Sequence, residues 1–519
     1  MTCFTVNNAK KHSKSISHNR KKKTIAYILA SSFLCFFTWS LSNFQLTFND
    51  TKIIILNNEV SLLHSTSIKY LSFAIDASLF RNMNTLPILN KEFINLARHL
   101  SPAYVRFGGT SADCLFFNES LSNNSGIARN PINGEDISNF AITENDFYSL
   151  YAFSRASNLR MIFDLNVLIR KSDGSWNDSN ARKIVEFAKS RGMTLDWHLG
   201  NEPNSFLYVF NVEVTAQQLA KDYCDLRSLL NTSGYKDSIL VGPEVNQVGG
   251  SSHQGETYAK EFLKNSKDSV DYITWHQYYL RGEYAQVKDF INASVFNYLS
   301  PSIKSMEEAV DSSGNKIPMW LSETSTAYDS GTPGITDRYV AGFLWLDKLG
   351  YSAKTGVQVV IRQSFFGGNY ALISSDLNPN PDWWVSVIFK EFVSNKVLNL
   401  SIPNNSGNLR LYAHCTPEKA LLKSDQAVTI FGVNIDENPV WISIQAIPVP
   451  STSSIFFYGL TSDKLQSRSI QMNGEVLKLL PNGNVPPFKP IIFNSEEIVK
   501  IPAYSMVFIV VHDTQIPDC

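Results

Sequence analysis

The stretch LDWHLGNEP, from Leu195 to Pro203, is a short apolar run of the kind that forms a β-strand, and it ends in polar residues. Asn201 and Glu202 close the run. The proline behind them stops it, because proline lacks the backbone N–H that a sheet ladder needs. The sequence therefore presents a carboxylate at the end of a strand, where it is accessible, instead of within the strand.

Eight runs of this type follow one another along the chain, and stretches with helical character separate them. They span Tyr70 to Asp76, Tyr104 to Thr110, Leu159 to Leu168, Leu195 to Pro203, Ser238 to Val245, Tyr272 to Leu280, Met319 to Ser325 and Val357 to Phe366. Alternating strands and helices predict a parallel sheet, and eight such units over about 300 residues match a (β/α)8 barrel. The alternative is a doubly wound open sheet. No Gly-x-Gly-x-x-Gly loop follows the first run, so no dinucleotide is predicted.

The chain after Asp382 loses its helical pattern, and short strand-like runs such as LRLYAHC, AVTIFGV and SMVFIVV take over, with Gly, Pro and Asn between them. This pattern is typical of a β-sandwich. The stretch from Lys52 to Thr66 also resembles a strand and is expected to join that sandwich. We therefore predict a basic leader with an apolar segment at 1–48, N-terminal strands at 49–66, the barrel at 67–382 and the sandwich at 383–519.

The seventh run, MWLSETS, ends like the fourth and places Glu323 at its end. Because the C-terminal ends of all barrel strands face one active site, Glu202 and Glu323 are expected to face each other across it. Glycoside hydrolysis with retention needs two carboxyl groups about 5 Å apart, whereas inversion needs roughly 6.5 to 9.5 Å. The pattern predicts a glycosidase that works with two glutamates and no metal or other cofactor.

Other polar side chains are expected near the same face of the barrel. His276 and Tyr278 of the sixth run, and Tyr370 behind the eighth, either contact substrate or serve as packing residues. Arg106 and Arg362 are predicted to point into the barrel, where a buried guanidinium needs a carboxylate partner. The nucleophile or a purely structural acid would meet that need.

The composition of the 519 residues is that of a globular protein, with 44% hydrophobic, 12% aromatic and 18% charged residues. It excludes disorder, collagen, a coiled coil and a polytopic membrane protein. The net charge of -1 is unevenly distributed: residues 1–48 hold seven Lys and Arg and no acid, which leaves 39 basic against 47 acidic residues in the body. An acidic body argues against nucleic acid as a partner.

An uncharged segment of 18 residues, Ile25 to Ser42, follows the basic cluster. It is long for a signal-peptide core and short for a membrane span, so it is either cleaved near Ser42 or kept as a single-pass membrane anchor. Both outcomes predict an extracellular, lysosomal or membrane-anchored protein with a lumenal catalytic body. Eight Asn-x-Ser/Thr sequons are candidate glycosylation sites in that compartment: Asn49, Asn118, Asn123, Asn177, Asn231, Asn292, Asn399 and Asn404.

Four cysteines lie outside this N-terminal region, namely Cys114, Cys224, Cys415 and Cys519, and they allow three pairings. We favour a bond between Cys519 and Cys415, because it would hold the end of the chain in place. The cysteine spacing is not that of a zinc site.

Several stretches together resemble the heparanase family, glycoside hydrolase family 79, and its animal members in particular: SPAYVRFGGTSAD, LGNEPNSF, DYITWHQYYL, WLSETSTAY, GFLWLDKLG and RQSFFGGNY. The resemblance runs from Ser67 to Cys519. It implies an endo-β-glucuronidase that cleaves heparan sulfate with retention, a barrel with a C-terminal β-sandwich, and the Cys415–Cys519 bond. It also implies that Glu202 is the acid/base and Glu323 the nucleophile. The expected substrate-binding residues are Asp76, Thr110, Asn201, His276, Tyr278, Tyr328, Gln363, Gly368 and Tyr370.

The chain departs from that family mainly around the cleft. The segment from Asn118 to Ile142 is 25 residues long, shorter than the insert that animal members lose on activation. Tyr208, Gly249 and Glu283 stand where the family places basic residues for sulfate. Asp329 stands where the family has a glycine that faces the uronate.

These observations predict a retaining endo-β-glucuronidase for heparan sulfate or a related glycosaminoglycan. Two alternatives remain. The first is a β-glucuronidase for weakly sulfated or small glucuronides, which the missing basic residues favour. The second is a heparan-sulfate-binding protein without turnover, against which the presence of both glutamates argues.

Overall fold

The computed structural model describes residues 53–56, 60–121, 130, 134–402, 407–421, 426–445 and 447–519. None of the helices in these ranges combines the length and the apolar character that a membrane span requires. The predicted targeting segment, Ile25 to Ser42, and the sequons at Asn49, Asn123 and Asn404 lie outside the described residues. Among the other sequons, Asn177 is half-buried, and the exposed asparagines are Asn118, Asn231, Asn292 and Asn399.

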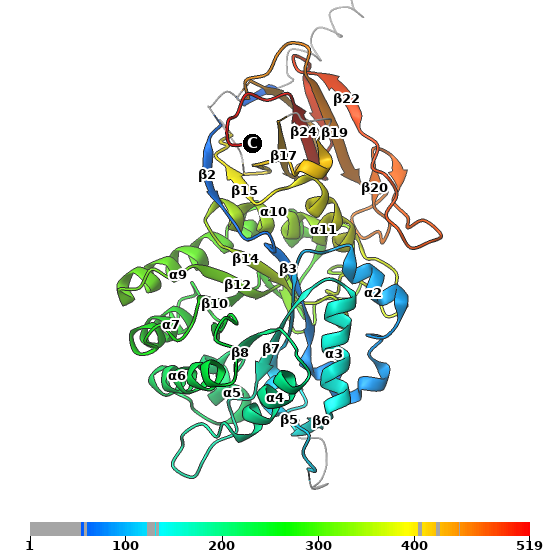
Figure 1. Cartoon of the computed structure of the whole chain (residues 1–519). Coiled ribbons are helices and arrows are strands. Elements are labelled where there is room, and N and C mark those ends of the chain that lie inside the picture. The colour runs from blue at the N-terminus through cyan, green and yellow to red at the C-terminus, as the bar shows by residue number, and fades with distance from the viewer. Residues whose placement is uncertain are drawn as a thin grey trace, which may run out of the picture. The chain divides into compact units, whose positions relative to one another are not determined.

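Eight parallel strands form one sheet in the order β8-β7-β4-β3-β14-β12-β10-β9 (Figure 1). Their bounds are β3 Leu71–Asp76, β4 Tyr104–Gly108, β7 Arg160–Leu165, β8 Asp196–Leu199, β9 Val241–Val245, β10 Tyr272–Gln277, β12 Met319–Thr324 and β14 Val359–Arg362. A parallel bridge between Trp197 and Leu240 joins β8 to the start of β9 and closes the ring. Each of the eight predicted runs contains one of these strands, so the predicted (β/α)8 barrel is confirmed.

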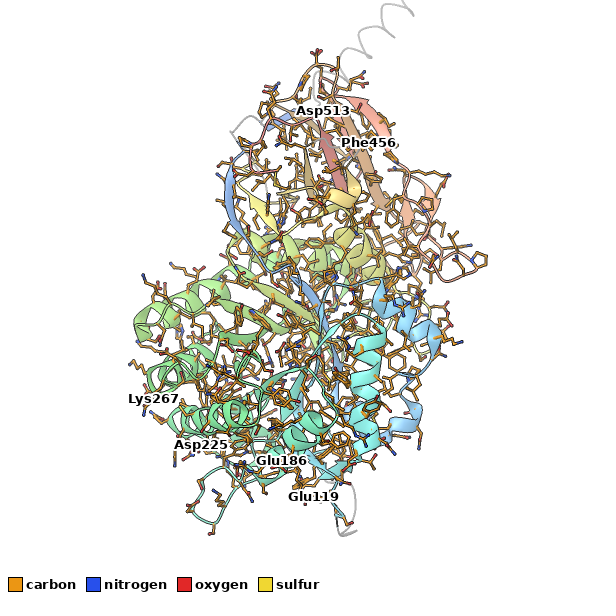
Figure 2. The ribbon with its side chains drawn as sticks, viewed as in Figure 1. Glu119, Glu186, Asp225, Lys267, Phe456 and Asp513 are labelled. Atoms are coloured by element: carbon orange, nitrogen blue, oxygen red, sulfur yellow. A yellow bond between two sulfur atoms is a disulfide. The ribbon has the colours of Figure 1, made fainter. Side chains whose placement is uncertain are left out.

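Helices cover the outside of the barrel. Their bounds are α2 Lys91–Arg98, α3 Glu144–Ala156, α4 Ser179–Ser190, α5 Phe206–Phe210, α6 Ala216–Thr232, α7 Gln254–Asn265, α8 Ala293–Phe296, α9 Leu299–Ser313, α10 Ala341–Lys354 and α11 Pro381–Phe392. Helix α3 begins after Thr143, whose hydroxyl accepts from the Asp146 amide while the Asp146 carboxylate accepts from the Thr143 amide. This capping box satisfies two backbone donors of the first turn. Charged side chains such as Glu186 of α4 and Asp225 of α6 are exposed on the outer helices (Figure 2).

Two short strand pairs lie in the loops of the barrel. β5 (Leu115–Phe117) pairs with β6 (Phe140–Ile142), so that these two strands flank most of the segment from Asn118 to Ile142. β11 (Leu280–Arg281) pairs with β13 (Ala327–Tyr328), and these two strands come directly after β10 and β12. Both pairs therefore shape the face at which the barrel strands end.

The C-terminal part is a β-sandwich that also takes strands from the N-terminal side of the barrel. Its larger sheet runs β2-β15-β16-β17-β24-β19-β20-β21, with β22 also paired to β19, and a smaller sheet runs β1-β18-β23. The bounds are β1 Ile53–Leu56, β2 Leu62–Ser65, β15 Lys396–Leu398, β16 Leu409–Cys415, β17 Ala427–Asn434, β18 Val440–Ile444, β19 Ser454–Thr461, β20 Gln471–Met472, β21 Glu475–Val476, β22 Ile491–Asn494, β23 Val499–Ile501 and β24 Ser505–His512. β2 pairs with β15, so the predicted N-terminal contribution is confirmed.

The larger sheet has two buried faces. Along β24, Val507, Ile509 and Val511 belong to the core between the two sheets, whereas Phe508 and Val510 belong to the core that the sheet shares with the barrel. This is the alternation expected of a strand whose neighbouring side chains point to opposite faces. Helices α10 and α11 lie against the barrel side of the sheet, which explains why almost all of their residues are buried.

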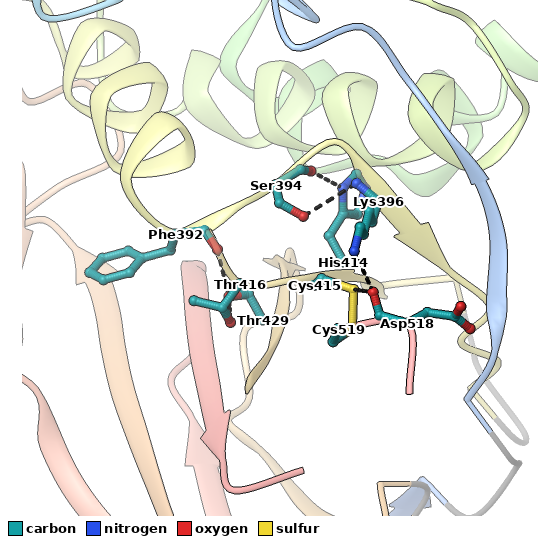
Figure 3. Close-up of a disulfide and its surroundings, with 9 residues drawn as sticks. All are labelled: Phe392, Ser394, Lys396, His414, Cys415, Thr416, Thr429, Asp518 and Cys519. Carbon is teal, nitrogen blue, oxygen red and sulfur yellow. Dashed lines mark hydrogen bonds between the residues drawn. A yellow bond between two sulfur atoms is a disulfide. The ribbon is translucent and has the colours of Figure 1, made fainter. Parts of the chain in front are cut away.

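A disulfide joins Cys415 of β16 to Cys519, as the sequence predicted (Figure 3). Close to it, the Lys396 ammonium donates to the Asp518 carbonyl at 2.6 Å. The C-terminal segment is thus tied to the larger sheet at two points, β15 and β16. Cys114 and Cys224 form no disulfide in the structure.

Candidate active site

Glu202 and Glu323 lie at the C-terminal ends of two barrel strands, β8 and β12. Glu202 has a left-handed backbone (φ 56°, ψ 52°), and its amide donates to the Glu244 carbonyl at 3.0 Å, which turns the chain sharply after β8. Side-chain atoms of Glu202, His276 and Glu323 all lie within 4.8 Å of one another. The structure therefore brings the two predicted catalytic carboxylates together.

The Glu323 carboxylate is held from two sides. Arg106 of β4 donates to its Oε2 at 2.9 Å, and the Tyr278 hydroxyl donates to its Oε1 at 2.9 Å. Arg106 also donates to the Asn201 amide oxygen at 2.6 Å and lies 3.2 Å from the Glu244 carboxylate. One buried guanidinium thus fixes side chains from three other strand ends.

These contacts set the ionisation of Glu323. Burial by itself would raise the pKa of the carboxyl group, but the positive charges of His276 and Arg106 and the hydrogen bonds from Tyr278 and Arg106 outweigh it. The pKa of Glu323 is therefore lowered from its usual value, and the group is a carboxylate at mildly acidic pH.

Glu202 is bonded to a different partner, the imidazole of His276. Nδ1 of His276 lies 2.7 Å from Glu202 Oε1, and its Nε2 lies 2.7 Å from Glu244 Oε2. Burial would lower the pKa of His276, but the charges of Glu323 and Glu202 and the hydrogen bonds to Glu202 and Glu244 raise it to about 10. His276 is therefore an imidazolium that donates from both nitrogens.

Two further carboxylates, Glu244 and Asp113, support the site, and no motif in the sequence had indicated either of them. Burial would raise the pKa of Glu244, but Arg106, His198 and His276 together hold it well below its usual value, and its carboxylate orients His276. Asp113 accepts from the Asn201 amide at 2.8 Å and so fixes the turn before Glu202. Glu244 is the last residue but one of the fifth predicted run, close to its end as the two catalytic candidates are in theirs.

Three of the residues expected to bind the glucuronate, Asp76, Gln363 and Tyr370, lie together near Glu323, at or after the ends of β3 and β14. Gln363 donates to the Asp76 carboxylate at 2.7 Å, and burial raises the pKa of Asp76. A side chain at Gly368, where φ is 75°, would approach the Tyr370 ring to 2.9 Å. Thr110 begins the turn after β4 and is half-buried.

Two other predicted residues have different surroundings. Tyr328 is exposed, and its ring centroid lies 6.2 Å from that of Tyr278, so it lies at the rim of the site. Arg362 pairs with Asp382 of α11 at 2.8 Å and donates to the Tyr370 carbonyl at 2.7 Å. Of the two arginines predicted in the barrel, Arg106 binds the candidate nucleophile and Arg362 has a structural partner.

The spacing of Glu202, His276 and Glu323 would also suit a metal ion. A histidine that binds a metal must offer a neutral nitrogen lone pair. Here both nitrogens of His276 donate to carboxylates, and Arg106 occupies one oxygen of Glu323. The chemistry of these donors fits an ion-pair and proton-transfer site better than a metal centre.

A family model described as "Glycosyl hydrolase family 79, N-terminal domain" matches residues 74–350. The chain belongs to this family. It is 34% identical over 501 residues to the heparanase of Rattus norvegicus, a match that covers 88% of this chain and 92% of the relative. The hyaluronoglucuronidase of Hirudo nipponia is 31% identical over 464 residues, with 83% and 92% covered. The "Inactive heparanase-2" of Homo sapiens is 29% identical over 518 residues, with 87% and 86% covered.

The structure of this chain is also similar to solved structures of other proteins. A 4-O-α-L-rhamnosyl-β-D-glucuronidase from Fusarium oxysporum 12S matches with a TM-score of 0.62 and 15% sequence identity, and the match covers 89% of this chain and 100% of that chain. At this level of identity, the likeness shows a shared fold.

Proposed function

We propose that the protein is a retaining endo-β-glucuronidase that cleaves glucuronide linkages in heparan sulfate or a related glycosaminoglycan. The observation that carries this proposal is the approach of Glu202 and Glu323 to within 4.8 Å, with Glu323 kept ionised by Arg106 and Tyr278. A retaining mechanism needs carboxyl groups about 5 to 5.5 Å apart, and an inverting one needs more room for a water molecule.

In the first step Glu323 attacks the anomeric carbon while Glu202 donates a proton to the leaving oxygen. In the second step Glu202 takes a proton from a water molecule while the water oxygen attacks the anomeric carbon. The bond to Glu323 breaks, and the sugar leaves with retained configuration. His276 orients the acid/base, because as an imidazolium it donates from Nδ1 to Glu202 Oε1 at 2.7 Å. No metal or other cofactor takes part in these steps.

The substrate assignment rests on the family and on the residues beside the nucleophile. Relatives named heparanase and hyaluronoglucuronidase support a glycosaminoglycan substrate. Asp76, Gln363 and Tyr370 would bind the hydroxyl groups of the glucuronate. All three carry hydrogen-bonding groups; Gln363 is buried, and Asp76 and Tyr370 are half-buried. We also propose that the protein works in the secretory pathway, as the segment Ile25 to Ser42 and the sequons predict.

A second candidate is a β-glucuronidase that acts on weakly sulfated or small glucuronides. The carboxylates of Glu283 and Asp329, which flank Arg281 at the rim, favour it over an enzyme for highly sulfated chains. A heparan-sulfate-binding protein without turnover is a third reading, and a relative is named inactive. The paired glutamates and the ion pairs that tune them argue for turnover.

The test is cleavage of heparan sulfate and of an aryl β-glucuronide at about pH 5, followed by product size and product configuration. Glu202→Gln and Glu323→Gln should each abolish chain cleavage, whereas the exposed Glu186→Gln on α4 should leave it unchanged. Inverted product, or chain cleavage that survives in Glu323→Gln, would refute the proposed mechanism. Hydrolysis of the aryl glucuronide alone would favour the second candidate. The absence of measurable activity on both substrates would favour the third.

A further inference from the structure

The rim beside the nucleophile is built by the short strands that follow β10 and β12. In the β11–β13 pair, Arg281 lies opposite Tyr328. Tyr328 is 43% exposed and packs near Tyr278, the residue that donates to Glu323. The rim is therefore directly continuous with the catalytic centre.

Two more exposed tyrosines belong to the same surface. Tyr284 is 65% exposed, and Arg281 lies over its ring at 5.5 Å from the centroid. Tyr208, on α5 just after the acid/base, is 55% exposed. Burial raises the pKa of Tyr328. The nearby groups of Asp329, Tyr208 and Tyr284 raise it further. We call Tyr208, Tyr284 and Tyr328 the tyrosine rim.

The cation of this rim is already neutralised. Nε of Arg281 lies 2.9 Å from the Asp329 carboxylate, and its terminal nitrogen lies 3.3 Å from the Glu283 carboxylate. Two carboxylates against one guanidinium leave the group with a net negative charge. Charged hydrogen bonds to an incoming anion would have to displace one of these carboxylates first.

A third carboxylate belongs to the loop that joins β5 to β6. The Asn130 side chain donates to the carbonyls of Tyr208 and Val209. The backbone N–H of Asn130 donates to the Glu135 carbonyl at 2.9 Å. Burial and the charges of Asp76, Glu202 and Glu323 together raise the pKa of Glu135 to about 7. At about pH 5 Glu135 is therefore mostly protonated, and it adds negative potential to the site from the Tyr208 side only near neutral pH.

We infer that the tyrosine rim and its carboxylates make the protein prefer unsulfated glucuronide chains, among the glycosaminoglycans of the proposed function, over sulfated ones. The exposed rings offer apolar faces to the C–H faces of pyranose rings, which an unsulfated chain presents. Sulfate groups would instead meet Glu283 and Asp329, because Arg281, the cation described at this rim, is already paired with both. Contacts between like charges are unfavourable. This inference rests on the proposed function and names the substrate class of the same site.

The test compares an unsulfated polymer of alternating glucuronate and N-acetylglucosamine with the same polymer after chemical sulfation. The wild-type chain should cleave the unsulfated polymer with a kcat/KM roughly tenfold higher at low ionic strength, and added salt should narrow the ratio, since it screens exposed charges. The variant Glu283→Gln/Asp329→Asn removes both carboxylates with little change in shape, and asparagine tolerates the left-handed backbone at 329 (φ 54°). In this variant, the ratio of kcat/KM for the unsulfated polymer to kcat/KM for the sulfated polymer should fall by roughly tenfold.

The control is Glu186→Gln/Asp225→Asn, which changes the net charge equally on outer helices and should leave the ratio as in wild type. The inference is overturned if the wild-type chain cleaves the sulfated polymer equally well or better. It is also overturned if the rim variant has the same kcat/KM ratio for the two polymers as the wild type. Wild type without activity on either polymer or on an aryl glucuronide refutes the proposed function instead. In that case, binding of the two polymers to the wild-type chain decides the inference, and tighter binding of the sulfated one overturns it.

Discussion

The pKa of Glu323, the proposed nucleophile, can be changed by removing a single oxygen atom, the Tyr278 hydroxyl that donates to it. The hydroxyl lies 2.9 Å from Oε1 of a buried carboxylate, and a hydrogen bond to a charged group contributes about 1.5 to 3 kcal/mol. One pKa unit corresponds to about 1.4 kcal/mol, so Tyr278→Phe should raise the pKa of Glu323 by roughly one to two units. Arg106 keeps its own contact with Glu323 in this variant.

The sign of the effect follows from the role proposed for Glu323. A nucleophile must be ionised, so kcat/KM falls as the pH drops through its pKa. Loss of a donor that stabilises the carboxylate raises that pKa, and the acidic limb should move to higher pH by roughly one to two units. The assay is kcat/KM for an aryl β-glucuronide, measured from roughly pH 3 to pH 8.

Tyr279→Phe provides the matched control. Tyr279 is the next residue and is also buried, but its hydroxyl has no hydrogen-bond partner within the described part of the chain. Its removal should leave the acidic limb in place. An acidic limb that Tyr278→Phe leaves unmoved, or shifts to lower pH, would refute the assignment of that limb to Glu323.

Three further predictions concern the acid/base, the central arginine and the disulfide. Glu202→Ala should lose chain cleavage but still react with an aryl glucuronide whose leaving group needs no protonation, and added azide should then give the β-glucuronyl azide; an α-azide would contradict retention. Arg106→Met should lower the free energy of unfolding by roughly 3 to 5 kcal/mol in denaturant titration, because it leaves buried carboxylates without their cation; wild-type stability would contradict this. Cys415→Ser/Cys519→Ser opens a loop with a sequence separation of 104 and should cost about 4 to 5 kcal/mol, seen as a lower thermal midpoint; an unchanged midpoint would show that the bond adds little.

The barrel and the two glutamates were predictable because their signals are local. Each strand appears as one β-rich run, and Glu202 and Glu323 each end a run in a polar sequence. Glu244 also lies close to the end of a run, yet its role depends on Arg106 and His276, which come from two other strands. Such a contact is set by the closed barrel and has no signal within one stretch of sequence.

The partners of the buried arginines show the same limit. Sequence patterns indicated that Arg106 and Arg362 need carboxylates, but not which ones. Arg362 pairs with Asp382, the second residue of α11, and this helix lies across the predicted boundary between barrel and sandwich at residue 382. The strand signal that starts the sandwich is visible only after the helix ends.

The position of β24 in the larger sheet bears on how the chain is synthesised. β24 pairs with β17 on one side and β19 on the other, and it follows both of them in the sequence. Until β24 emerges from the ribosome, β17 and β19 have unpaired edges, and exposed edges of this kind promote association between chains. During the same period, the faces of helices α10 and α11 that pack against the sheet are only partly covered. A nascent chain would therefore complete its barrel early and depend on chaperones until the last strand enters the gap.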